Sequence, residues 1–423
     1  MYWLIENQSQ LEELYNSDLE DAFIEIIPFS NEIHPVENQV CAIYIRPLNS
    51  TKGYIASISH SETLSLDIRV ISKFKRIYVR DKKEFLHYFI LKTLLDTTLQ
   101  QPPYIQDYTQ THSWFYHKYK NKTDVNRIVP IVKHYEYCEK TFNDLKNRID
   151  EPVNDFYNNK ASVVFNAIER SGIQVDREKF EPRFHLLDTN TVYSQFNFKT
   201  LTTRPSNKFN GVNFAAINKE NGDRQCFIPS NDLLFEIDIS AYHPTLLAKQ
   251  IDYEFKEKDI HQAFADMYQV DYKKAKELTF KQMYGGVFKQ YEELEFFRKM
   301  KVYTDDLWAR FQNEGFVECP ISKHIYRNDV LMDMKPQKLL NYILQNLETA
   351  TNICILWEMF RVLRGKNTKL ILYTYDSFTF DVDKSEKDTI KEIIEIFKKY
   401  DLGIKMECGK NYGEMNKVEC SLV

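Results

Sequence analysis

The chain has 423 residues, of which 43% are hydrophobic and 14% aromatic, so it can bury a sizeable core in roughly two or three domains. Glycine and proline number only 11 and 13, which excludes collagen-like and disordered compositions. The net charge of −5 gives no general attraction to nucleic acid, although local clusters rather than the total set the field at a surface.

The seven cysteines are scattered and form no Cys-x-x-Cys pair, which argues against a structural zinc site and suits a reducing interior. No basic segment followed by an apolar run opens the sequence, and no stretch of about 18 apolar residues occurs. We therefore expect neither a signal peptide nor a membrane partner. The expected location is the cytoplasm, of a host cell if the source is viral.

The first part of the chain, residues 1–150, is expected to be an α/β unit. Short runs of β-branched and aromatic residues predict strands, and helical periodicity follows them. The strands are expected at 22–27, 40–45 and 53–58, and the helices at 82–98 and 127–148. One amphipathic helix, ending in a turn at Gly172, is expected over 153–180. The basic and aromatic segment 114–134 is a candidate contact for a nucleic-acid strand.

The second part of the chain alternates buried strands with long helices. Phe235-Glu-Ile-Asp-Ile predicts a buried strand, and 370–382 predicts a hairpin with its tight turn at 376–377. The other expected elements are helices over 244–310, 336–364 and 384–400, a hairpin over 315–326 and a strand over 403–408.

Two aspartates stand at the ends of apolar strands, Asp238 and Asp376. Two such carboxylates brought together repel each other unless a divalent cation lies between them, which is the arrangement that two-metal phosphoryl transfer requires. The alternative is two unrelated aspartates, which the spacing alone favours because Asp is common in turns.

A helical segment from Tyr272 to Gly286 combines cations and aromatic rings. Lys276, Phe280 and Tyr284 are spaced i, i+4 and i+8, so they share one face. An ammonium group there can neutralise a triphosphate, and a ring can stack on a base or sugar. Taken alone, the segment is more often an amphipathic helix with aromatic core positions and solvated lysines.

Taken in order, these segments resemble family A DNA polymerases. Phe235 to Ala248 is similar to the first palm motif, Asp259-Ile-His to the start of the fingers, and 272–286 to the nucleotide-gripping fingers helix. Further similar segments are Thr202-Thr-Arg-Pro-Ser, Arg224-Gln-Cys-Phe, Gly315-Phe-Val-Glu, Asn341 to Asn346, Thr374-Tyr-Asp-Ser and Gly409-Lys-Asn-Tyr-Gly. The resemblance covers about residues 200–415.

The resemblance implies a role for each matching residue. The catalytic residues would be Asp238, Asp376 and Lys276. The nucleotide-binding residues would be Arg224, His243, Lys276, Phe280 and Tyr284. Contacts to nucleic acid would come from Arg204, Asn341, Gln345 and Tyr375. Two Mg²⁺ ions would be held by Asp238, Ile239 and Asp376.

The implied fold is α+β: a right-hand polymerase with palm, fingers and a very short thumb, preceded by an α/β exonuclease-like domain. The expected domains are the exonuclease-like domain at 1–150, a connecting helix and reduced thumb at 151–200, palm at 201–256 and 336–423, and fingers at 257–335. The implied function is template-directed extension of a DNA primer with dNTPs in phage-type replication. Primer–template DNA and a processivity factor or replisome subunit would be its partners.

The sequence departs from the family pattern at several positions. His243 replaces the glutamate that blocks a ribose 2′-hydroxyl, Tyr375 and Ser377 flank the second aspartate in place of a histidine and an acid, and Tyr272 replaces a basic residue. The first strand has no Asp-x-Glu, although Glu25 remains, so proofreading is not expected. The resemblance implies a thumb of about a hundred residues before the segment that begins at Thr202. Here only the residues from Arg177 to Leu201 occupy that place.

Other functions stay open at this point. Because His243 replaces the sugar-blocking glutamate, a primase or RNA-capable polymerase is the first alternative. A catalytically inactive, nucleic-acid-binding homologue is the second, and the presence of both aspartates and Lys276 argues against it. A nuclease is the weakest, since a lone carboxylate cannot hold two metals.

Overall fold

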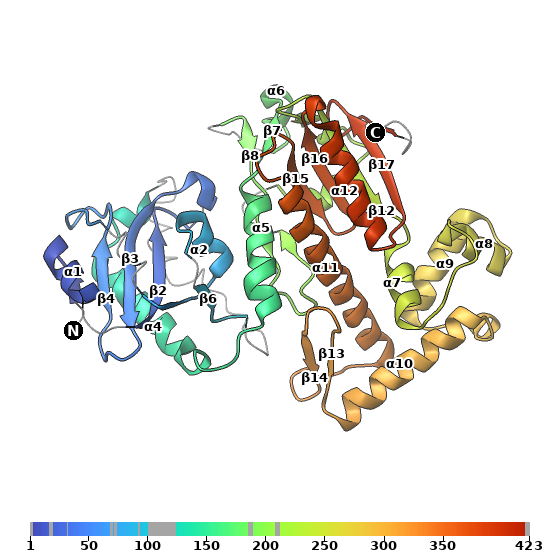
Figure 1. Ribbon diagram of the computed structural model, residues 1–423, viewed down its shortest axis with the longest axis horizontal. Coiled ribbons are helices and arrows are strands. Elements are labelled where there is room, and N and C mark those ends of the chain that lie inside the picture. The colour runs from blue at the N-terminus through green and yellow to red at the C-terminus, as the bar shows by residue number, and fades with distance from the viewer. Residues whose placement is uncertain are drawn as a thin grey trace. The chain divides into compact units, whose positions relative to one another are not determined.

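The structure is a computed structural model that describes residues 3–16, 20–31, 33–67, 71, 74–91, 94–99, 124–184, 189–207 and 212–418 (Figure 1). The chain divides into two compact units, Met1–Arg170 and Ser171–Val423, and each contains its own sheet and core. No helix in the described ranges is long and apolar enough to cross a lipid bilayer. Residues 114–123 of the proposed strand contact lie outside those ranges.

The first unit contains a six-stranded mixed sheet in the order β1-β4-β3-β2-β5-β6. Its strands are β1 (Trp3–Ile5), β2 (Asp21–Pro28), β3 (Val40–Pro47), β4 (Tyr54–Ser57), β5 (Arg76–Val79) and β6 (Leu94–Asp96). β2, β3 and β4 form an antiparallel meander, whereas β5 pairs parallel with both β2 and β6. The meander confirms the three strands that the sequence predicts.

Helices cover both faces of this sheet, because successive side chains of a strand point to opposite faces. Ala22 and Ile24 of β2 pack in one core, and Phe23 and Ile27 pack in the other. The covering helices are α1 (Gln8–Asn16) and α2 (Lys82–Tyr88) on the first face and α4 (Ile131–Leu145) on the second. The helix predicted over 82–98 is wrong beyond Tyr88, because the chain after it forms β6 and extends the sheet.

Residues 151–170 belong to the first unit, whereas the sequence places a boundary at 150. Glu169 at the end of α5 (Ser162–Glu169) is completely buried and forms ion pairs with Lys83 at 2.6 Å and His87 at 2.7 Å. Removing one partner of so buried a pair is strongly destabilising, so α2 and α5 are held together. The single helix predicted over 153–180 is wrong beyond α5, because the chain then enters a short strand.

The second unit is built on an antiparallel five-stranded sheet in the order β15-β16-β12-β17-β18. Its strands are β12 (Leu233–Ile239), β15 (Lys369–Thr374), β16 (Ser377–Val382), β17 (Ile404–Gly409) and β18 (Met415–Lys417). The sequence predicts β12, the β15–β16 hairpin and β17 correctly, but not β18. The pairing gives β12 a neighbour on each side, which makes it the centre of the sheet.

One face of β12 is covered and the other carries acids. Ile237 lies opposite Phe378 of β16, whose ring contacts Phe397 of α12 (Lys387–Lys399) at 5.3 Å between centroids. Glu236 and Asp238 alternate with Ile237, so they lie on the opposite face of the sheet. The alternation of the strand therefore directs its polar side chains away from the packed helix.

Five α-helices follow β12 in the described chain, and the last of them, α11, leads back to the sheet (Figure 1). These helices are α7 (Tyr242–Gln250), α8 (Ile260–Tyr268), α9 (Tyr272–Gly285), α10 (Glu295–Asn313) and α11 (Pro336–Val362). Asp259 and Asp271 cap α8 and α9 by accepting backbone N–H bonds in the first turn. Ring contacts among Phe264, Phe296 and Phe297 pack α8 against α10.

The remaining strands of the second unit are short. They are β7 (Ile173–Val175), β8 (Thr191–Val192), β9 (Phe196–Asn197), β10 (Ser206–Asn207), β11 (Phe227–Ile228), β13 (Phe316–Glu318) and β14 (Ile325–Arg327). β13 and β14 confirm the hairpin predicted over 315–326. Between β7 and β8 the described chain contains one short helix, α6 (Arg177–Phe180).

Candidate active site

Asp238 and Asp376 lie side by side because β12 and β16 are neighbours in the sheet. Asp238 is opposite Ser377 in the antiparallel register, and Asp376 is the turn residue directly before Ser377. The backbone N–H of Ile239 donates to the carbonyl of Asp376 at 2.9 Å, which ties the turn to the end of β12. Two aspartates 138 positions apart, by subtraction of their numbers, thus meet at one end of the sheet.

Both carboxyl groups resist ionisation. Partial burial raises the pKa of Asp238 to about 6, and the negative charges of Asp376 and Glu236 add to the increase. Lys405, which is opposite Asp238 on β17, lowers that pKa, as does Lys219. Crowding by protein atoms also raises the pKa of Asp376, although this residue keeps contact with solvent. A cation bound between the two groups would relieve their repulsion.

The donor set fits magnesium. Mg²⁺ prefers oxygen ligands and usually takes one or two protein carboxylates, with water and substrate phosphates completing its shell. Asp238 and Asp376 supply two carboxylates, and Ile239 can supply only its backbone carbonyl. The described part of the chain contains no group of three or more His, Cys, Asp or Glu side chains that could hold a metal ion. A metal bound at the two aspartates would therefore need ligands from water or substrate.

The raised pKa of Asp238 predicts a pH-dependent stability in the absence of divalent metal. The folded state holds the proton up to about pH 6, whereas the unfolded carboxyl releases it near 3.8. Stability contributed by this group is therefore lost as pH rises from about 4 to about 6. We expect Asp238→Asn to unfold at higher urea than the unaltered chain at pH 8 with a chelator present, and the gain to shrink towards pH 4. If Asp238→Asn increased the stability equally at all pH values, the raised pKa of Asp238 would be contradicted.

The Lys276 face of α9 is directed in part towards α7. The rings of Phe280 and Tyr284 stack at 6.0 Å between centroids, which confirms that these residues share a face. The Tyr284 hydroxyl hydrogen-bonds His243 Nδ1 on α7. Lys276 is exposed, and its charge acts on His261, whose pKa is lowered mainly by burial. Lys276 forms no ion pair with another described residue, so its ammonium is available for a ligand.

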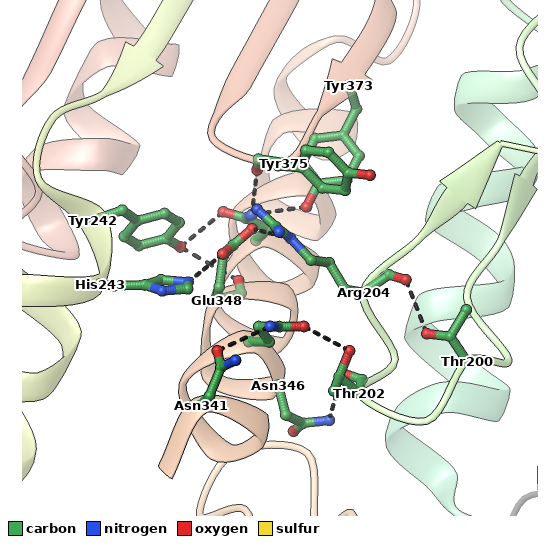
Figure 2. Close-up of polar contacts among 12 residues, drawn as sticks. Thr200, Thr202, Arg204, Tyr242, His243, Asn341, Asn346, Glu348, Tyr373 and Tyr375 are labelled. Atoms are coloured by element: carbon green, nitrogen blue, oxygen red, sulfur yellow. Dashed lines mark hydrogen bonds and ion pairs between the residues drawn. The ribbon is translucent and has the colours of Figure 1, made fainter. Parts of the chain in front are cut away.

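Glu348 of α11 connects residues that the sequence predicts separately (Figure 2). The carboxylate is buried, with 2% of the residue exposed. One oxygen accepts from Arg204 Nε at 3.2 Å, and the other hydrogen-bonds His243 Nε2. Arg204 also stacks on the Tyr375 ring at 3.9 Å, beside Asp376. The predicted nucleotide-binding His243 and the predicted nucleic-acid-binding Arg204 and Tyr375 therefore form one cluster.

Asn352, one turn further along α11, holds the hairpin turn that carries Asp376. Its amide nitrogen donates to the Tyr373 hydroxyl at 2.8 Å and to the Tyr375 carbonyl at 2.7 Å, while its oxygen accepts from Tyr242 at 2.8 Å. Tyr375 adopts a φ of 59°, an uncommon conformation for a side chain of its size. The turn lies at 375–376, one residue before the position that the sequence predicts, because Ser377 already pairs with β12.

Thr202 and Thr203 dock on α11 beside the same cluster. The Thr202 hydroxyl donates to Gln345 Oε1 at 3.0 Å, and the Gln345 amide donates to Asn341 Oδ1 at 2.9 Å. Asn346 donates to Thr203 Oγ1 at 2.8 Å and to the Thr202 carbonyl at 3.4 Å, and Figure 2 shows the second of these contacts. The structure therefore brings together the two segments for which the sequence predicts contacts to nucleic acid.

Arg224 is less directly connected to the aspartates. It stacks on the Tyr412 ring at 4.5 Å and donates to the Ile217 carbonyl. The pKa of Tyr412 is raised chiefly by burial, and the charge of Glu236, two residues before Asp238 on β12, adds to the increase. Arg224 thus lies on the acidic face of the sheet, but its guanidinium is held by protein partners.

Sequence reasoning missed Glu348, Asn352 and Lys405. Glu348 and Asn352 lie among many apolar residues of α11, and both are buried. Nothing in their spacing distinguishes them from the residues that pack the core. A glutamate within an apolar helical run is a signal that the sequence does contain. If such a glutamate is buried, its carboxylate needs a hydrogen-bonding or charged partner from elsewhere in the chain. Lys405 could have been found only from the strand register that places it opposite Asp238.

Comparison with known proteins bears on the fold. No protein-family model matches the sequence, and no curated protein matches it. Among solved structures, the POL domain of Pol1 from M. smegmatis, in complex with DNA primer-template and dNTP, superimposes with a TM-score of 0.68. The match covers 97% of this chain and 99% of that chain, at 12% sequence identity. The chain has the fold of a DNA polymerase domain.

The comparison confirms the mixed α/β polymerase fold that the sequence predicts. The match extends over nearly the whole chain, so it includes the sheet that carries Asp238 and Asp376 and the helices that surround it. At 12% identity it carries no residue roles with it. The exonuclease-like nature of the first unit, the reduced thumb and the limits of palm and fingers stay predictions.

Proposed function

We propose that the chain is a DNA-dependent DNA polymerase of the family A type, which extends a primer with dNTPs by two-metal nucleotidyl transfer. The observation that carries the proposal is the pair Asp238 and Asp376, side by side at one end of the central sheet in a chain with a polymerase fold. Two bound Mg²⁺ ions would activate the primer hydroxyl and stabilise the leaving oxygen. The backbone pairing of β12 with β16 holds the two carboxylates next to each other.

The nucleotide side of the proposed site is formed by α7 and α9. Lys276 would neutralise the triphosphate, Phe280 would stack on the incoming base or sugar, and Tyr284 would mark the position of the templating base. Tyr284 is already bound to His243, which supports placing these residues at one site. Arg224 would reach the triphosphate only after leaving the Ile217 carbonyl.

The primer–template side is formed by the Thr202–Arg204 segment and α11. Asn341 and Gln345 are amides that can hydrogen-bond base edges in a minor groove, and Arg204 can contact the primer strand. Their mutual contacts support a single surface for nucleic acid. In this proposal the antiparallel sheet with α11 and α12 is the palm, and 257–335 is the fingers.

Primer extension with Mg²⁺, using deoxy- and ribonucleotides in parallel, tests the proposal. We expect extension with deoxynucleotides that depends on the template. Because His243 replaces the sugar-blocking glutamate, extension with ribonucleotides at similar efficiency would favour the primase or RNA-capable alternative. Binding of primer–template without any extension would favour an inactive homologue.

We propose that the first unit is a degenerate exonuclease-like domain. Glu25 on β2, the one acid left on the predicted first strand, is buried and pairs with Arg80 at 2.7 Å. Burial raises the pKa of Glu25, and the Arg80 charge opposes that increase. A carboxylate neutralised by arginine is a poor metal ligand, which supports a structural role for this unit.

The absence of proofreading is a second prediction. A labelled single strand incubated with the protein and Mg²⁺, without nucleotides, should keep its full length. Glu25→Gln should give the same result, because the Glu25 carboxylate has no catalytic role in this proposal. The prediction would be contradicted if the unaltered chain shortened the strand progressively from its 3′ end and the Glu25→Gln variant did not.

The short segment 177–201 predicts distributive synthesis. Affinity for duplex depends steeply on the number of phosphate contacts. Of its four cations, Arg177, Lys179 and Arg183 lie in ion pairs with acids. We expect the isolated chain to add few nucleotides per encounter in the presence of a DNA trap, and less as salt increases. Products hundreds of nucleotides long would contradict this prediction. They would also remove the reason to expect a processivity factor or replisome subunit as a partner in phage-type replication.

A further inference from the structure

The buried carboxylate of Glu348 is shared by two residues that belong to different sides of the proposed site. Arg204, from the segment after β9, takes one oxygen, and His243, from α7, takes the other. We propose that Glu348 is a positioning residue that couples the primer side of the site to the nucleotide side. This inference rests on the proposed function and assigns to Glu348 a role that none of the predicted site residues has.

Hydrogen bonds at both ring nitrogens fix the orientation of the His243 imidazole. A carboxylate can only accept, so His243 Nε2 must carry the proton that faces Glu348. Burial raises the pKa of the Tyr284 hydroxyl, so this hydroxyl stays protonated and can donate to His243 Nδ1. The hydrogen bonds Tyr284–His243–Glu348 can therefore all run in one direction, from the tyrosine hydroxyl through the imidazole to the carboxylate. Tyr284, at one end of this series of hydrogen bonds, belongs to α9, the helix that also carries Lys276.

The same carboxylate holds Arg204 in place. The Arg204 side chain is 34% exposed, whereas that of Glu348 is 3% exposed, so the arginine can reach a ligand while the glutamate cannot. Arg204 lies on the Tyr375 ring, in the turn that ends at Asp376. Figure 2 shows Arg204 and His243 approaching Glu348 from opposite sides.

The cluster reaches the catalytic turn through Arg204, whose guanidinium lies over the ring of Tyr375, the residue before Asp376, at 3.9 Å. If Arg204 turns to a primer, Glu348 keeps His243 as its one partner from this cluster. A buried carboxylate depends strongly on each partner it has, so a change at Arg204 is transmitted to His243 and Tyr284.

A double-mutant cycle tests the coupling through the KM for dNTP at saturating primer–template. The variants are Arg204→Ala, Glu348→Gln and the double variant. Arg204→Ala should raise the KM about tenfold, a size typical of coupling between contacting residues. The same substitution in the Glu348→Gln background should change the KM less than about twofold, because the amide no longer carries the shared charge. Urea unfolding of every variant checks that each one is folded.

Glu358→Gln is the matched control. Glu358 is on the same helix but pairs with Lys399 and Tyr400, away from the cluster. In this background Arg204→Ala should again raise the KM about tenfold. An equal increase in the Glu348→Gln background would overturn the inference while leaving the proposed function intact. Absence of primer extension by the unaltered chain would overturn the proposed function, and the inference with it.

Discussion

Asp238→Asn and Asp376→Asn should each reduce primer extension by roughly a thousandfold, equivalent to about 4 kcal/mol of transition-state stabilisation. Each change removes a negative charge from the site where a divalent cation would be held, while the amide keeps the size of the side chain. The strand register that joins the two residues involves backbone groups, so the sheet should stay intact. Single-turnover extension with saturating dNTP and Mg²⁺ measures the effect.

The control for these variants is Asp401→Asn, in the loop before β17, where the side chain is 93% exposed. It should extend primers like the unaltered chain. Affinity for primer–template, measured by fluorescence anisotropy without metal, should change little in the Asp238 and Asp376 variants. Extension within tenfold of the unaltered chain by either one would refute the two-metal assignment.

Lys276→Ala should reduce the kcat/KM for dNTP by about 10- to 150-fold, because a charge-assisted hydrogen bond to phosphate contributes about 1.5–3 kcal/mol. Lys276 is exposed on α9, on the face that carries Phe280 and Tyr284. The helix is capped by Asp271 and packs through buried residues such as Ala275 and Met283, so the loss of an exposed lysine should leave it folded. Steady-state kinetics of single-nucleotide addition give the comparison.

Lys281→Ala is the matched control on the same helix. Lys281 is also exposed, but it lies five residues after Lys276 and so points to a different side of α9. It should keep the kcat/KM within about twofold, as is usual for surface substitutions. Similar losses in both variants would mean that general charge, rather than a specific phosphate contact, explains the Lys276 effect.

The elements that the sequence predicts correctly are those with a local signal. β12 and the β15–β16 hairpin are runs of apolar residues with clear ends, and Phe280 and Tyr284 share a face because of helical spacing. β6 and β18 are strands of only three residues, too short for an alternating pattern to mark them. The unit boundary at Arg170 depends on the ion pairs of Glu169 with Lys83 and His87, which no local pattern predicts.

By itself, the sequence determined the candidate aspartates, the lysine–aromatic helix and the resemblance to family A polymerases, because residue type and short-range spacing carry that information. The tertiary structure alone decided that Asp238 and Asp376 are neighbours, and that Glu348 joins Arg204 to His243. Arg204 and Glu348 are 144 residues apart, and their contact exists only because the segment after β9 docks on α11. Such a contact is set by the packing of whole elements, and no periodicity within either segment encodes it.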